Sequence, residues 1–159
     1  MKKILSLIVF VCLAFSCDET IYSTIPYAPV NLLLNLDFAD NKLNANLAYE
    51  EVTQARIASD RIGFGGILVI NGMGVEPLNL FAYDLACPVE AQRNIKIKPD
   101  NTSAPGAEIP MAMTATCPKC GAVYNIVNGY GTPQSGTKLF LKTYKVVSES
   151  GGRQYRVIN

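Results

Sequence analysis

Apolar and polar residues alternate over several short stretches of the chain, which is the pattern of strands with one buried face. The clearest alternation covers residues 30–36, and a second covers residues 43–47. Further strands are predicted over residues 67–70, 78–83, 94–98, 109–115, 123–127, 138–147 and 154–158. Residues 50–57 fit either a short strand or a helical turn. Since no amphipathic stretch of ten or more residues is present, the pattern predicts an all-β fold.

A glycine-rich segment, residues 62–66, leads into the apolar strand predicted at 67–70. Its glycines come before the strand, and neither a phosphate-loop lysine nor an amphipathic helix follows them. We therefore expect these glycines to allow a close approach of two backbones inside a sheet.

The first residues have the pattern of an export signal. Lys2 and Lys3 precede an apolar run over residues 4–15, which is too short to span a bilayer. Residues 13–17 resemble a bacterial lipobox, in which Cys17 would be acylated and become the new N-terminus; simple secretion with Cys17 as an ordinary thiol is the alternative. We expect a signal peptide at 1–16, a lipidated tether at 17–29 and one β domain at 30–159.

These features predict an outer-membrane lipoprotein of a Gram-negative bacterium, held in the membrane by acyl chains at Cys17. They leave open whether the domain faces the periplasm or the cell surface. The formal net charge of +1 gives no basic face that would favour nucleic acid. The sequence does not identify a protein partner.

Cysteine carries the candidate chemistry, because the chain has five cysteines and no histidine. Cys12 would leave with the signal peptide, so Cys87, Cys117 and Cys120 remain in the domain. The segment Cys117-Pro-Lys-Cys120-Gly predicts a tight turn with both sulfurs on one side. This is the form of one half of a rubredoxin or zinc-ribbon site, with Cys87 as a third thiolate.

A complete site of that kind has a second C-x-x-C, and this sequence has only one. Glu90 or Asp84 would have to supply the fourth ligand. A thiol–disulfide exchange site at Cys117 and Cys120 is disfavoured, because no helix N-terminus is predicted there to lower a thiol pKa.

The two cysteine loops resemble those of Rieske-type iron–sulfur domains, which carry C-x-H in one loop and C-x-x-H-G in the other. Val89 stands at the histidine position of the first loop, and Cys120 at that of the second. Further similarities follow at residues 121–124, 128–129, 131–133 and 141–146, so the resemblance covers residues 60–158. It implies a Rieske-like antiparallel β-sandwich with a small two-loop subdomain of the cluster-binding type.

The resemblance places Cys87, Cys117, Cys120 and Tyr124 around the cluster position, while Ala122 replaces a hydrogen-bonding serine. A standard Rieske cluster needs two imidazoles, which this chain cannot supply. Lys2-Lys3 is also not a twin-arginine signal, so no cluster would be preassembled before export. The family arrangement would instead bring Cys87 close enough to Cys117 or Cys120 for a disulfide in an oxidising envelope.

We therefore expect a non-enzymatic, envelope-anchored domain without a cofactor, which has a structural or interaction role and whose two loops are tied by a disulfide. The alternative is a small electron-transfer protein with an atypical [2Fe–2S] cluster, or a zinc protein, in which Cys87, Cys117 and Cys120 hold the metal. In the cluster case Tyr124 would lie beside the sulfurs.

Overall fold

The computed structural model describes residues 23–74, 78–149 and 151–159. Strands make up nearly all of its regular structure, and the only helix in these ranges is the short 3-10 helix η2 (Asn41–Asn44). The prediction of an all-β fold is confirmed. Within the same ranges, no helix has the length and apolar character needed to cross a membrane. The expected signal peptide and the lipidation residue Cys17 lie outside the described residues.

The larger sheet has seven antiparallel strands in the order β2-β4-β5-β10-β11-β1-β3 and is nearly closed. Its strands are β1 (Val30–Asn35), β2 (Tyr49–Val52), β3 (Arg61–Ile62), β4 (Ile67–Asn71), β5 (Leu80–Asp84), β10 (Thr143–Ser148) and β11 (Gln154–Ile158). The alternation predicted at residues 30–36 is correct, because Leu32, Leu34 and Leu36 are fully buried in one core. Strand β1 pairs with β11 on one side and with β3 on the other, so the first and last strands of the described residues are neighbours in this sheet.

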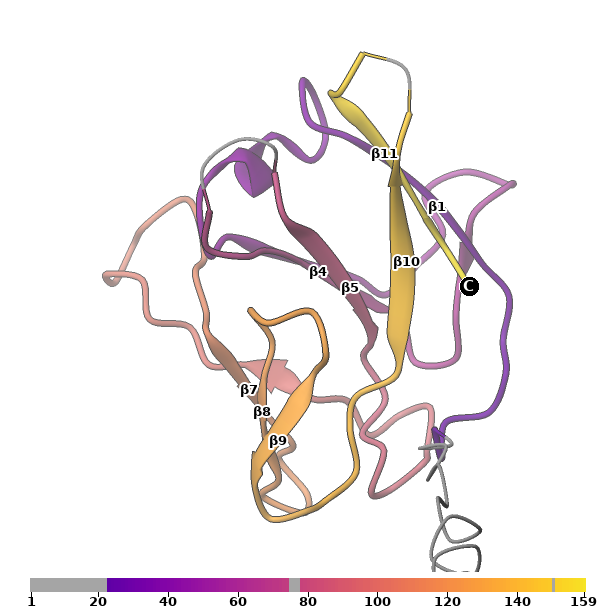
Figure 1. Ribbon diagram of the computed structural model, residues 1–159, viewed down its shortest axis with the longest axis vertical. Coiled ribbons are helices and arrows are strands. Elements are labelled where there is room, and N and C mark those ends of the chain that lie inside the picture. Colours follow the sequence, from indigo (N-terminus) through magenta and orange to yellow (C-terminus); the bar gives the residue numbers. More distant parts are fainter. Residues whose placement is uncertain (1–22, 75–77, 150) are drawn as a thin grey trace, which may run out of the picture.

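The smaller sheet has four antiparallel strands in the order β6-β7-β8-β9. They are β6 (Lys98–Pro99), β7 (Thr114–Thr116), β8 (Val123–Asn125) and β9 (Thr132–Ser135). Figure 1 shows β7, β8 and β9 beside β4 and β5, and the chain passes through the small sheet between β5 and β10. Because the small sheet covers an outer face of the large one, a second hydrophobic core forms between them.

Strand β4 faces both cores, which explains why its sequence is apolar at consecutive positions. Ile67 and Val69 belong to the core inside the large sheet, whereas Leu68 and Ile70 belong to the core under the small sheet. On the neighbouring strand β5, Tyr83 points into the second core and donates a hydrogen bond to the carbonyl of Ile126 at 3.0 Å. The two sheets are therefore joined by apolar burial and by a buried polar contact.

The strand predicted over residues 43–47 is wrong. Leu43 is the buried residue of η2, and Leu47 has a positive φ of 64°, which is incompatible with a regular strand. The Asn44 side chain donates to the carbonyls of Leu36 and Asn41, so local side-chain hydrogen bonds favour the turn.

Other strand boundaries also differ from the pattern. The strands predicted over 94–98 and 109–115 are mostly wrong, because the structure has only β6 (Lys98–Pro99) and β7 (Thr114–Thr116) there. Residues 50–57 begin as β2, which ends at Val52. The strand expected over 138–147 starts only at Thr143, and residues 132–135 form β9 where a loop was expected. Strand β9 is short and mostly exposed at the edge of its sheet, so no alternation of buried and exposed side chains reveals it.

The described part of the expected tether, residues 23–29, lies against the domain. Ile25 is only 3% exposed, and the Asn159 side chain donates to the carbonyl of Ala28. Thr24 donates to the carbonyl of Pro88, in the loop that carries Cys87. This segment is therefore part of the folded domain, because its apolar side chain and backbone groups find partners there.

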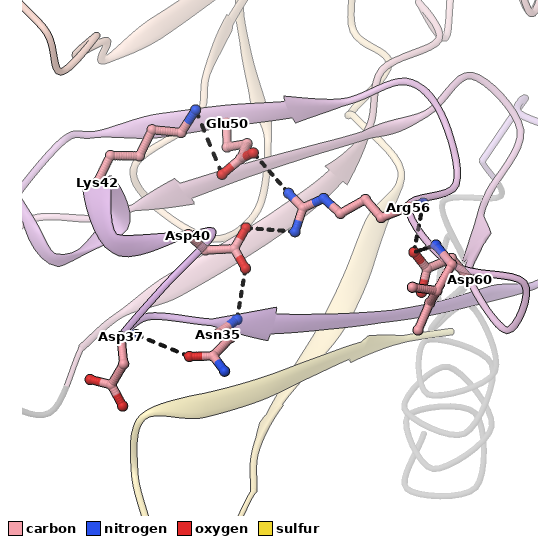
Figure 2. A network of polar contacts seen from close by, with 8 residues as sticks. Asn35, Asp37, Asp40, Lys42, Glu50, Arg56 and Asp60 are labelled. Carbon is pink, nitrogen blue, oxygen red and sulfur yellow. Dashed lines mark hydrogen bonds and ion pairs between the residues drawn. The ribbon is translucent and has the colours of Figure 1, made fainter.

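A polar network holds the loops around η2 and β2 (Figure 2). The Asp40 carboxylate, with a side chain 1% exposed, pairs with Arg56 at 2.7 Å and accepts a hydrogen bond from the amide of Asn35. Arg56 also pairs with Glu50 at 2.8 Å, and Lys42 lies 3.7 Å from the other Glu50 oxygen. Burial raises the pKa of Glu50, while the charges of Lys42 and Arg56 act against that rise.

Candidate metal centre

The structure brings the three predicted thiols together. The sulfur atoms of Cys87, Cys117 and Cys120 all lie within 4.8 Å of one another. Cys87 and Cys117 are buried, and Cys120 is partly exposed. Cys87 precedes the small sheet, whereas Cys117 and Cys120 lie in the turn between β7 and β8. The packing of the small sheet against β4 and β5 therefore places the two loops side by side.

Each of these three cysteines is a free thiol in the structure. The Cys87 and Cys120 sulfurs lie 3.6 Å apart, whereas a disulfide bond is about 2.0 Å long. The disulfide expected between the two loops is thus not supported by the observed geometry. The separation is that of two free thiols in contact, and it is also short enough for both sulfurs to bind one metal ion.

The two cysteine loops have the same backbone conformation, which the sequence reading missed. The amide of Ala91 donates to the carbonyl of Cys87 at 2.8 Å, and the amide of Gly121 donates to that of Cys117 at 2.9 Å. Ala91 and Gly121 both have positive φ, 48° and 72°. Both loops begin with Cys-Pro, and this shared dipeptide was the sequence signal of a shared turn. The first loop has Ala91 where the second has a glycine, so its positive φ could not be predicted.

Backbone amides in each loop point at the first sulfur. Burial raises the pKa of Cys87 to about 12, and the amides of Glu90 and Val89 oppose this rise. Burial also raises the pKa of Cys117, but the amides of Cys120 and Lys119 and the thiols of Cys87 and Cys120 together outweigh burial, so the pKa lies below its ordinary value. Such N–H groups stabilise a thiolate, the form of cysteine that binds metals.

Tyr124 lies where the resemblance places it, beside the sulfurs. Its side chain is fully buried on β8, with the hydroxyl 4.0 Å from the Cys87 sulfur. Burial, and then the neighbouring Cys87, raise the pKa of Tyr124 above its ordinary value. The hydroxyl therefore stays protonated and is able to donate a hydrogen bond to the sulfur.

Asp84, one of the two carboxylates predicted as a fourth ligand, is fully engaged elsewhere. It accepts hydrogen bonds from the amides of Phe64, Gly65 and Ala86 and from the Tyr144 hydroxyl. These bonds occupy both carboxylate oxygens of a side chain with no exposed surface. The prediction for Asp84 is wrong, because ligation would leave several buried donors without partners.

The second predicted carboxylate, Glu90, follows Cys87 by three positions. Its side chain is 16% exposed, and one oxygen lies 2.6 Å from the ammonium of Lys119. This ion pair joins the two cysteine loops. Val89, which stands at the histidine position of the Rieske-type loop, is 40% exposed.

No protein-family model, no curated protein and no solved structure matches this chain. What this site can do follows from the geometry of the three thiols and the two loops.

Proposed function

We propose that this domain binds one metal ion through Cys87, Cys117 and Cys120, and that the metal joins the two loops of a protein with a structural or interaction role. The observation that carries the proposal is the convergence of the three sulfurs within 4.8 Å. Zinc bound at about 2.3 Å to tetrahedral thiolates separates two sulfurs by about 3.8 Å. The Cys87–Cys120 separation of 3.6 Å is close to this value.

Zinc is the metal that this ligand set favours. Thiolates are soft ligands that select zinc, Cu(I) or iron–sulfur clusters, and structural zinc sites are built largely from cysteine. The backbone amides of the two cysteine loops and the Tyr124 hydroxyl provide the hydrogen bonds that hold ligand sulfurs in place. A metal at this point would replace the disulfide as the link between the loops.

A second candidate is electron transfer by an atypical [2Fe–2S] cluster. It is favoured by the Tyr124 hydroxyl beside Cys87, since hydrogen bonds to sulfur tune the reduction potential of a cluster. The second cysteine loop joins the central strands β7 and β8 of a small sheet packed on a larger one, which supports a Rieske-like arrangement. The absence of histidine from the sequence opposes a standard cluster of that family.

Attachment to the outer membrane through Cys17 completes the proposal. Its support is the sequence of the first residues, in which a short apolar run ends at Ser16-Cys17. We propose a non-enzymatic role for the same domain, since the sequence offers no histidine to act as a general base. Nucleic acid is not a proposed partner, because the chain is nearly neutral.

The test is to purify the mature protein from its own host without oxygen or chelators, and to measure its metals, labile sulfide, visible spectrum and disulfides. One zinc per chain in a colourless protein, absent from a variant with serine at all three positions, is the expected result. A brown protein with labile sulfide would establish the cluster instead. A metal-free protein with a Cys87–Cys120 or Cys87–Cys117 disulfide would refute the metal site.

A further inference from the structure

We infer that Glu90 is the fourth ligand of this metal centre, which makes the site three thiolates and one carboxylate. The inference rests on the proposed metal site and adds to it a second residue of the loop that carries Cys87. It follows from the matching conformations of the two loops and from the position of the Glu90 side chain.

The two loops are equivalent residue by residue. In each, a cysteine is followed by a proline, the amides two and three positions later point at its sulfur, and the fifth residue has positive φ. In the second loop the first and fourth residues are Cys117 and Cys120, and both belong to the thiol group. The corresponding residues of the first loop are Cys87 and Glu90.

The Glu90 carboxylate already reaches from its own loop to the other. Its partner Lys119 lies between Cys117 and Cys120 in the sequence, and the ammonium is 2.6 Å from the carboxylate oxygen. The Lys119 ammonium is also close enough to Cys117 and Cys120 for their charge to act on it. This ion pair holds the carboxylate between the two loops but outside the group formed by the three sulfurs, so the Glu90 side chain has to turn from Lys119 to bind the same metal.

The chemistry of the group suits this role. Carboxylate oxygens bind zinc at about 2.0–2.2 Å, so in the metal-bound protein the Glu90 carboxylate would contact the metal in place of the Lys119 ammonium. The Lys119 side chain is 54% exposed, so its ammonium can return to water when the carboxylate turns to a metal. In the metal-free protein the Lys119 ammonium thus balances the negative charge of the mostly buried Glu90 carboxylate.

The experiment is a titration of the metal-stripped mature protein with Co²⁺, which reports thiolate ligands by charge-transfer absorption, followed by competition with Zn²⁺ and a chromophoric chelator. We compare the wild type with Glu90→Gln and Glu90→Cys. Glu108→Gln and Glu108→Cys are the matched controls, because Glu108 is an exposed glutamate in a loop away from the cysteines.

With Glu90 as a ligand, the Glu90→Gln substitution weakens the binding of Co²⁺ and Zn²⁺ by about tenfold or more. Glu90→Cys tightens binding and raises the charge-transfer absorption by about one third, as a fourth thiolate requires. The gain in Glu90→Cys shows that a side chain at position 90 reaches the metal even if Glu90→Gln folds poorly, and a folded Glu90→Gln protein with wild-type affinity would overturn the carboxylate ligand.

Two other results are distinguishable. If the wild type binds Co²⁺ through thiolates but both Glu90 variants match the Glu108 controls in spectrum and affinity, Glu90 is not a ligand and the three-thiolate site stands. If no protein in the series shows thiolate-to-Co²⁺ absorption or binds Zn²⁺, the proposed metal site fails, and the role of Glu90 fails with it.

Discussion

The hydroxyl of Tyr144 on β10 donates a hydrogen bond to the buried carboxylate of Asp84 at the end of β5. The same carboxylate accepts hydrogen bonds from the amides of Phe64, Gly65 and Ala86. Since Cys87 lies three positions after Asp84 and the amide of Ala86 is one of these donors, the carboxylate fixes the backbone from which the first cysteine loop starts. Its role is structural, and it supports the thiol site without touching a sulfur.

We predict that Asp84→Asn destabilises the protein by about 2–4 kcal/mol. An amide keeps one acceptor oxygen and turns an NH₂ group toward backbone N–H donors, so buried donors lose their partner. Urea unfolding measures the effect. Asp37→Asn is the control, because the Asp37 side chain is 50% exposed and its pair with Arg153 lies at the surface. Equal effects of the two substitutions would contradict the role given to Asp84.

Tyr144→Phe is expected to have an effect that depends on pH. Burial, then the hydrogen bond to Asp84, raise the pKa of Tyr144 above its ordinary value. The stability from a protonated Tyr144 is therefore fully present below the unfolded tyrosine pKa of about 10 and is lost as pH rises further. At pH 7 the variant should lose about 1–3 kcal/mol with the hydrogen bond.

The difference between wild type and Tyr144→Phe should shrink as pH rises above about 10, because only the wild type must keep this group protonated. Unfolding free energies measured by urea at neutral pH and at several alkaline values test this. A difference that stays constant would show that the Tyr144 pKa is not raised by folding.

Gly65→Ala should be strongly destabilising, because an added Cβ would lie 2.5 Å from the backbone nitrogen of Ala86. That neighbour is backbone and cannot turn aside, so we expect a loss of about 2 kcal/mol or more. Gly74→Ala is the matched control: its Cβ would lie 2.6 Å from the Asn79 side-chain nitrogen, which can rotate away. Thermal unfolding of both variants compares the two. This contact confirms the close backbone approach expected for the glycine-rich segment.

Arg56→Met should cost about 3 kcal/mol, because it leaves the buried Asp40 carboxylate without its cation. Arg153→Met removes the exposed pair with Asp37 and should cost about 1 kcal/mol or less. Urea unfolding at neutral pH separates these values. Similar losses in both variants would mean that burial of Asp40 does not determine the strength of the pair.

With the proposed metal bound, its removal should lower the thermal stability of the wild-type protein, because a ligand that binds only the folded state stabilises it. We expect a chelator to lower Tm in the wild type and to leave Tm unchanged in Cys117→Ser, which lacks a central ligand. Differential scanning calorimetry with and without chelator measures this. A chelator effect of equal size in both proteins would contradict the assignment of Cys117.

The sequence by itself determined the all-β class, because alternation is a local property of residues 30–36 and 154–158. It also identified Cys87, Cys117 and Cys120 as one group, since three thiols in two Cys-Pro loops are visible without coordinates. It failed at residues 43–47, where side-chain hydrogen bonds to Leu36 and Asn41 override the alternation.

Only the tertiary structure decided which carboxylate pairs with the second cysteine loop and which one holds the fold. Asp84 and Glu90 both flank Cys87 in the sequence, yet the partners of Asp84 come from residues 64–65, 86 and 144, and that of Glu90 comes from the second cysteine loop. The sequence likewise did not predict the conformation shared by the two loops, because Ala91 adopts a positive φ that is usually predicted from a glycine. The physical reason is that such contacts depend on segments distant in the chain, whereas a local pattern records only which face of a strand is apolar.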